Sequence, residues 1–253
     1  MNISDPAFNY DQHGSRYSGY RRTDPRIAAH VWQALGQAKT VLNVGAGAGS
    51  YEPEDRYVVA VEPSPVMRAQ RQAAGRVPAI NAKADNLPFD DQSFDASMAI
   101  VTVHHWPDMR KGLQELRRVT RHQVVVMTFD PEALGDFWNV HYFPEVIDVE
   151  RARYPSIEFI TGVLGGRSEV KTIPIPFDCV DGFQEAFYGR PEAFLDPQVR
   201  LNQSAWGFLD EGQEKIIVER LEKDLRSGEW DRRYGYLRHQ AEFVCALRLV
   251  INY

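Results

Sequence analysis

The chain has 253 residues, of which 43% are hydrophobic, and a formal net charge of −6. This length suits one α/β domain with a modest additional segment, no apolar run is long enough to span a bilayer, and the acidic balance without a long Lys/Arg run argues against a nucleic-acid-binding protein. The same charge balance favours a small molecule as partner. Two cysteines and the lack of a visible secretory signal favour a reduced, cytoplasmic protein.

The first 38 residues form the first predicted segment. It begins with polar and aromatic side chains, and a helix is predicted over residues 25–35, where Ile27, Val31 and Leu35 recur at helical spacing. We expect this segment to fold over whatever the next part of the chain binds.

Residues 39–130 carry the most informative pattern. An apolar strand over residues 41–44 runs into Gly45, Gly47 and Gly49, and the next strand, over residues 57–61, ends at Glu62. Glycines let backbone N–H groups approach a ligand closely, and a carboxylate after the second strand can accept hydrogen bonds from both hydroxyls of a ribose. The pattern therefore predicts a nucleotide-like cofactor.

The glycine spacing narrows the choice of cofactor. A dinucleotide site has the spacing G-x-G-x-x-G and leads into a helix N-terminus, whereas here the acidic and proline-containing stretch SYEPED follows G-x-G-x-G. A phosphate loop of the form G-x-x-x-x-G-K-[ST] is also missing. Both NAD and ATP are therefore disfavoured.

The rest of this region continues the alternation of strands and helices. A third apolar segment covers residues 77–82, a strand over residues 96–101 ends just before His104 and His105, and an amphipathic helix is predicted over 109–120. A further buried strand covers residues 123–129. The cluster Asp90-Asp91-Gln92-Ser93 has the composition of a turn, so we expect no metal site there.

Beyond residue 130 the alternation stops. We expect residues 131–168 to form a cap insertion dense in aromatic side chains, with a helix over 145–154, and residues 169–253 to complete the sheet. Within this last part, 169–179 has the alternation of an edge strand, 181–235 is expected to be a substrate lid with a helix over 210–226, and 241–251 is expected to be the last strand.

From residue 40 to residue 130 the order of these motifs resembles the class I S-adenosylmethionine-dependent methyltransferases, in particular the small-molecule branch called type 11. The resemblance implies a Rossmann-like α/β fold with a mostly parallel seven-stranded sheet, an antiparallel last strand, helices on both faces and a helical, aromatic cap. It implies S-adenosyl-L-methionine as cofactor and methyl transfer to oxygen, nitrogen or carbon of a small molecule.

The resemblance also implies which residues hold the cofactor. Asp85 and Asn86 match the positions that meet adenine, and Tyr17, Arg21 or Arg22 would cover the methionine end. The family usually has Asp where this chain has Asn43, which keeps a carbonyl acceptor but loses the charge. The cofactor-binding candidates are Tyr17, Arg22, Asn43, Gly45, Ala46, Gly47, Gly49, Glu62, Pro63, Met67, Asp85, Asn86, Val101 and His104.

Catalysis needs few side chains because a sulfonium is already an activated methyl donor. Orientation alone supplies effective molarities of about 10⁵–10⁸ M, and a general base adds about 10²–10⁴-fold where the acceptor must lose a proton. The candidate bases are His104, His105 and His141. His104 and His105 have a packing role as their alternative, because the family carries a His-His-Trp ending with many substrates. The alternative for His141 is a hydrogen-bonded structural role.

Two other functions stay open at this point. A protein of this family can use the sulfonium for a reaction other than methylation, such as a cyclisation, and a relative can keep the fold as a non-catalytic regulator. The pattern is compatible with a monomer or a homodimer.

Overall fold

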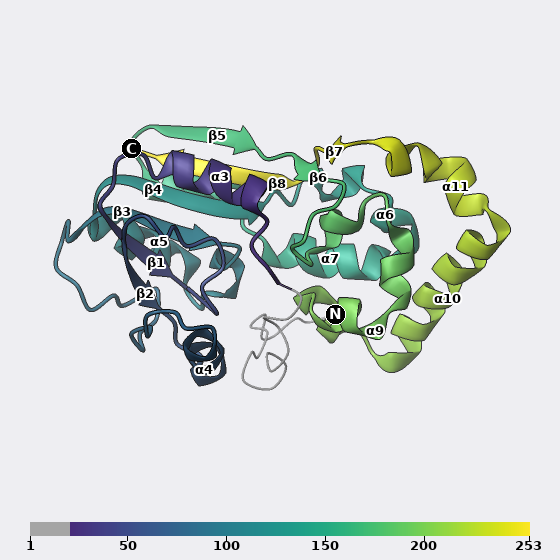
Figure 1. The fold of residues 1–253 in the computed structure, drawn as a ribbon, viewed down its shortest axis with the longest axis horizontal. Coiled ribbons are helices and arrows are strands. Elements are labelled where there is room, and N and C mark those ends of the chain that lie inside the picture. Colours follow the sequence, from purple (N-terminus) through teal and green to yellow (C-terminus); the bar gives the residue numbers. More distant parts are fainter. Residues whose placement is uncertain (1–20) are drawn as a thin grey trace.

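The computed structural model describes residues 21–253, and it consists of a helix-covered sheet beside a helical cap (Figure 1). The sheet has six strands. In spatial order they are β2 (Tyr57–Val61), β1 (Thr40–Val44), β3 (Phe94–Ile100), β4 (Thr120–Phe129), β8 (Leu247–Asn252) and β5 (Ser168–Thr172). Strands β2, β1, β3 and β4 are parallel, whereas β8 runs antiparallel to both β4 and β5. This is the Rossmann-like arrangement with an antiparallel last strand that the sequence predicts.

The prediction of seven strands is wrong by one. The apolar pattern of residues 77–82 predicts a strand, but only Ile80 pairs with the sheet, in an isolated bridge to Val61. Pro78 has no N–H to donate to a ladder, and Val77 and Ile80 are 63% and 41% exposed, so the segment has little apolar area to bury against the sheet.

Buried side chains alternate between the two faces of the central strands. Val124 and Val126 pack with helices α5 (Met109–Arg118) and α8 (Ile157–Leu164), whereas Val125 packs on the opposite face with helix α3 (Pro25–Ala34). Both faces of a parallel sheet must be covered, and this alternation is the expected result of the two-residue period of a strand. Helix α4 (Pro65–Ala73) follows β2.

The cap is built from short helices around an aromatic core (Figure 1). Trp138 lies 5.6–5.7 Å, ring centroid to ring centroid, from Phe143, Phe194 and Trp230. Its elements are α6 (Asn139–Tyr142), α7 (Pro144–Arg153), α9 (Pro197–Leu201), α10 (Glu211–Ser227), α11 (Glu229–Tyr234) and the two-stranded sheet of β6 (Ile175–Pro176) and β7 (Glu242–Phe243). Several aromatic side chains of the cap therefore hold it together.

The two helices predicted for the cap are present in the structure. The helix expected over 145–154 is α7, which begins at Pro144, and the helix expected over 210–226 is α10. Asp210 and Gln213 form a reciprocal capping box at the start of α10, and Gly228 ends it in the left-handed conformation. Within residues 21–253, none of the helices combines the length and apolar character needed to cross a membrane.

Candidate functional site

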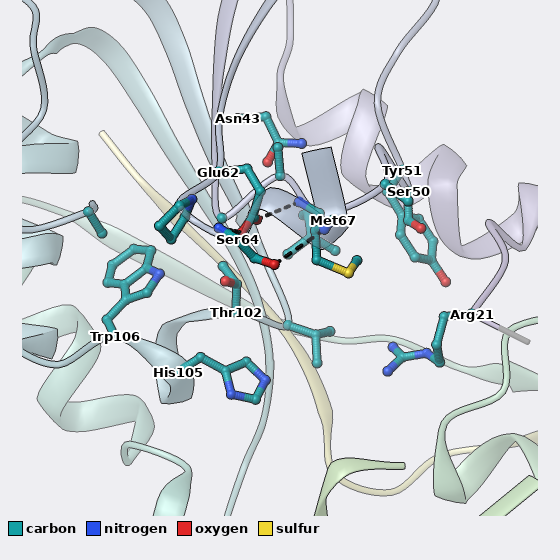
Figure 2. A pocket seen from close by; sticks show the side chains of 18 of the residues that line it. Arg21, Asn43, Ser50, Tyr51, Glu62, Ser64, Met67, Thr102, His105 and Trp106 are labelled. Carbon is teal, nitrogen blue, oxygen red and sulfur yellow. Dashed lines mark hydrogen bonds between the residues drawn. The ribbon is translucent and has the colours of Figure 1, made fainter. Parts of the chain in front are cut away.

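A cavity of about 330 Å³ lies at the carboxyl ends of β1, β2 and β3. The glycine loop, the start of α4, residues 82–84 and residues 105–107 line it, and Arg21 and Asp181 reach it from outside the sheet. In Figure 2, Asn43 and Glu62 lie at one side of this cavity, and Arg21 and His105 lie at the other. In open α/β sheets this edge is where ligands bind.

The backbone of the loop requires glycine at two positions. Gly45 has φ +68°, and a Cβ there would lie 2.1 Å from the Thr102 Oγ1 atom. Gly47 has φ +51° and donates its N–H to Glu62 Oε2 at 2.8 Å. A side chain at either position would strain the left-handed backbone, and at Gly45 it would also clash with the end of β3.

Two backbone N–H groups hold the carboxylate of Glu62 at the wall of the cavity. Its Oε1 accepts the N–H of Ser64 at 2.9 Å, while its Oε2 accepts that of Gly47, and the residue is 7% exposed. The carboxylate is therefore held in one orientation at the wall of the cavity.

Asn43 belongs to a buried charge network. Its Nδ2 donates to Glu52 Oε1 at 2.9 Å, and Glu52 forms a two-pronged ion pair with Arg71 at 2.7 and 2.9 Å. All three residues are at most 4% exposed. This orientation leaves Asn43 Oδ1 buried without a hydrogen-bond partner among residues 21–253, at the wall of the cavity. Such an atom needs a donor from a ligand or water.

A second network joins the sheet to the cap. Asp181 accepts from the Tyr51 hydroxyl at 2.7 Å and from Arg21 Nε at 2.7 Å. Burial, reinforced by Asp181, raises the pKa of Tyr51 well above its usual value, so the phenol stays protonated and donates. These contacts fix Arg21 at the wall of the cavity.

A smaller cavity, of about 30 Å³, adjoins the first and shares Arg21, Val101 and His105 with it. Val101 has φ +49°, which is rare for a β-branched residue and costs of order 1–3 kcal/mol. Backbone strain of this kind concentrates at functional sites, and here it lies where the two cavities meet.

The cofactor-binding candidates divide into those that line the first cavity and those that do not. Asn43, Gly45, Ala46, Gly47, Glu62, Pro63, Met67 and Val101 line it. Gly49, Arg22, Asp85, Asn86 and His104 are not among its lining residues, and Tyr17 lies outside the described residues. Arg22 and Asn86 are not buried, while Ala82, Lys83 and Ala84, just before Asp85, line the cavity.

The three histidines occupy different environments. His104 is 4% exposed, and burial lowers the pKa of both His104 and His105 well below the usual value, so both imidazoles are neutral. Arg153 lies 3.1 Å from His105 Nδ1 and can only donate, which places the His105 proton on Nε2. His141 is exposed in α6, its Nδ1 is 2.8 Å from the Tyr234 hydroxyl, and it lines neither cavity.

Sequence reasoning missed the residues that the cap contributes. Glu150, Gln184, Glu185 and Gln203 line the smaller cavity. They come from three distant parts of the chain, since only Gln184 and Glu185 are neighbours, and they share no motif, so no signal in the sequence joins them. In the part of the chain that the structure describes, no group of three or more His, Cys, Asp or Glu side chains is arranged to hold a metal ion.

Comparison with known proteins gives a consistent picture. A family model described as "Methyltransferase domain" matches residues 42–128. The chain is 27% identical to a malonyl-[acyl-carrier protein] O-methyltransferase of Halorhodospira halophila, over 75% of this chain and 74% of that protein. It is 28% identical to a ubiquinone/menaquinone biosynthesis C-methyltransferase of a Geobacter species, over 43% of this chain and 53% of that protein.

A solved structure extends the likeness to nearly the whole chain. It is that of a protein assigned as a methyltransferase of an antibiotic biosynthesis pathway in Anabaena variabilis, with a TM-score of 0.84 and 29% identity, and the match covers 93% of this chain and 100% of that one. The matched domain contains the glycine loop, Glu62 and the strands that form the cavity. The chain is therefore a methyltransferase enzyme, and these likenesses support its membership of the class I S-adenosylmethionine-dependent methyltransferases.

Proposed function

We propose that this methyltransferase binds S-adenosyl-L-methionine in the larger cavity and transfers its methyl group to a small-molecule acceptor that enters from the cap. The observation that carries the proposal is the position of Glu62, which directly follows β2 and lines the cavity. Backbone N–H groups of Gly47 and Ser64 each hold one of its two carboxylate oxygens. A fixed carboxylate in this place suits a vicinal diol, the recognition element of a ribose.

The donors and acceptors of the cavity fit this cofactor. Asn43 Oδ1 is an unsatisfied buried acceptor among the described residues, and the α-ammonium group of the cofactor supplies the donor it needs. Arg21 would hold the carboxylate of the methionine end. Ala82 and Ala84 offer an apolar wall for adenine, and Asp85 directly follows that wall.

Bound in this way, the cofactor supplies a methyl group already activated by a positively charged sulfur. The chain has to hold the acceptor in line with that methyl group and keep water out, for which orientation is worth roughly 7–11 kcal/mol of barrier. Val101 and His105, which line both cavities, would set the approach of the acceptor. His105 Nδ1 faces Arg153, so we assign His105 a role in positioning the acceptor and not in proton transfer.

A small molecule is favoured as acceptor because the two cavities share Arg21, Val101 and His105 in their walls and the smaller one takes only a small group. The acidic net charge of −6 also speaks against a polyanion. We keep the cytoplasm as the proposed compartment, since Cys179 and Cys245 are both free and buried, and a monomer or homodimer as the proposed assembly.

The proposal is tested by adding S-adenosylmethionine with either the low-mass or the protein fraction of a cell extract and measuring S-adenosylhomocysteine. We expect the low-mass fraction to support its formation, with one product heavier than its precursor by one methylene unit. Turnover with the protein fraction alone would indicate a macromolecular acceptor. A product of unchanged mass would favour a reaction such as a cyclisation, and cofactor binding without turnover in any fraction would favour a regulator.

A further inference from the structure

The smaller cavity has the size of a terminal functional group. Its volume of about 30 Å³ has room for only one or two water-sized groups. It meets the larger cavity at Arg21, Val101 and His105, so a group placed in it lies next to the methyl-transfer position that we propose. A larger acceptor would insert only its reacting end.

Several buried polar atoms in its wall lack hydrogen-bond partners among the described residues. Gln203 is 4% exposed, and neither its Oε1 nor its Nε2 has a hydrogen-bond partner among residues 21–253. The Nδ1 atom of His104, also 4% exposed, has none within the same part of the chain. Gln184 Nε2 and Glu185 Oε2 in the same wall are also without a partner among residues 21–253. Unsatisfied buried polar atoms cost about 1–3 kcal/mol each, so these five atoms in one wall indicate a polar occupant.

The charge of the wall selects the sign of that occupant. Glu150 and Glu185 line the cavity, and burial raises the pKa of each to about 7. Of the nearby cations, Arg21 is paired with Asp181 at 2.7 Å, whereas Arg153 contacts the neutral groups of His105 and Ser204 and keeps its positive charge. His104 and His105 are neutral because burial lowers the pKa of each imidazole.

When both glutamates are ionised, their two negative charges exceed the one positive charge of Arg153, so the cavity is negative. The Ala246 N–H donates to Glu185 Oε1 at 3.2 Å, and the amide of Gln184 lines the cavity together with Glu150. Neither of these neutral groups brings a positive charge, so a cation in the cavity would remove the penalty of ionising the two carboxyls.

Aromatic rings complete the environment. Phe129, Tyr154 and Phe183 line the cavity, with ring centroids 5.5 Å apart for Phe129 and Tyr154 and 5.4 Å apart for Phe129 and Phe183. Aromatic faces attract a desolvated ammonium group, whereas they offer nothing to a carboxylate.

We propose that the smaller cavity receives the protonated amine end of the acceptor, with Glu150 and Glu185 as its carboxylate partners and Gln203 as its polar neighbour. This inference rests on the proposed function for the neighbouring cavity. It makes the enzyme an N-methyltransferase of a small aliphatic amine.

The carboxylates also account for the proton that an ammonium must lose. An N–H bond breaks and the proton passes to the ionised glutamate pair, which leaves a lone pair on nitrogen. That lone pair forms the bond to the methyl carbon while the carbon–sulfur bond breaks. The electrons of the broken bond go to sulfur, which gives S-adenosylhomocysteine with a neutral sulfur. A group that titrates near neutrality suits this acceptance of a proton.

The test uses three probes of one size and different charge: ethylammonium, ethanol and acetate. Each is titrated at matched ionic strength into the protein with and without S-adenosylhomocysteine, and thermal unfolding reports binding. Ethylammonium should raise the unfolding temperature while ethanol and acetate should not, and its affinity should increase from about pH 6 to about pH 8 as the glutamates ionise.

Matched variants locate the effect. Glu150→Gln and Glu185→Gln keep the shape of the side chain and should weaken ethylammonium binding about tenfold or more, the effect of one lost charge-assisted hydrogen bond. The control is His141→Gln, at an exposed position outside both cavities, which should bind like the wild type. Stabilisation by S-adenosylhomocysteine in each variant shows that it is folded.

The outcomes separate the two proposals. If S-adenosylhomocysteine stabilises the protein but ethylammonium acts no better than sodium chloride, or acetate acts instead, the amine pocket is refuted and the cofactor site stands. If ethylammonium is selected but S-adenosylhomocysteine has no effect, the proposed function is refuted while the cation-selective cavity stands. Unchanged ethylammonium binding in both Gln variants would also refute the inference.

Discussion

The contact between Asn43 and Glu52 makes Asn43→Asp the most informative single substitution. In the wild type the Asn43 amide donates to Glu52 Oε1 at 2.9 Å, inside a network that is almost completely buried. An aspartate would replace this donor by a second carboxylate, and Arg71 is the cation that pairs with Glu52 there. Two unit charges at this distance repel by about 6 kcal/mol at an effective dielectric constant of 20.

Protonation of the introduced carboxyl group avoids this repulsion and limits the loss of stability. The introduced carboxyl can take up a proton, which costs about 4 kcal/mol at pH 7 from an unfolded-state pKa of about 3.9, and the protonated group can again donate to Glu52. Its pKa is then raised in the folded state, so stability falls as pH rises above about 3.9. We expect a loss of about 4 kcal/mol at pH 7 and about 1.5 kcal/mol at pH 5.

Urea denaturation of wild type and variant at the two pH values measures this difference, and thermal unfolding at pH 7 should fall by about 8–16 °C. The double variant N43D/E52Q removes one of the two charges and should recover most of the loss. A loss that is below about 1 kcal/mol, or that does not change between pH 5 and pH 7, would refute the reasoning about this network.

Three further predictions concern the cavity walls. Glu62→Ala should lower the affinity for S-adenosylhomocysteine by about 1.5–3 kcal/mol in calorimetry, because the ribose hydroxyls lose a charged acceptor; equal affinity would exclude Glu62 as the ribose ligand. His141→Ala should leave turnover unchanged, since the residue lines neither cavity, while His105→Ala should lower it with the cofactor still bound; steady-state kinetics that gave the reverse order would contradict this placement. Glu150→Gln should gain stability relative to the wild type as pH rises from about 4.5 to about 7, because the pKa of Glu150 is raised to about 7 in the folded protein and its protonated form is lost over that range. Denaturation curves that keep a constant difference across this range would count against a buried Glu150.

Local motifs are the part of the fold and site that sequence reasoning recovers. The strand before Gly45 and the strand before Glu62 are adjacent and parallel, so a short pattern places the loop and the carboxylate together. The helices α3, α5 and α10 follow from apolar periodicity, whereas the antiparallel direction of the last strand follows from the family resemblance.

Residues 77–82 show where a local pattern is insufficient. Their apolar composition resembles a strand, but Pro78 and an exposed edge position leave a single bridge at Ile80. Whether a short apolar segment pairs depends on what covers it, which is a tertiary property.

The charge networks could not be predicted because their members are distant in the sequence. Glu52 belongs to a run of acidic residues and looks solvated until Arg71, which lies on α4, neutralises it. In the same way, Asp181 joins Tyr51 to Arg21, and Glu150 and Glu185 meet only because α7 and the segment after β6 pack together in the cap.

Calorimetric titration of the wild-type protein with S-adenosylhomocysteine, and separately with NAD, tests the central claim most directly. We predict one saturable site for S-adenosylhomocysteine and no detectable heat for NAD, because Glu62 and Asn43 match a ribose and an α-ammonium group and the loop lacks the helix N-terminus that a pyrophosphate needs. Binding of NAD in preference to S-adenosylhomocysteine, or binding of neither, would contradict the assignment of the cavity.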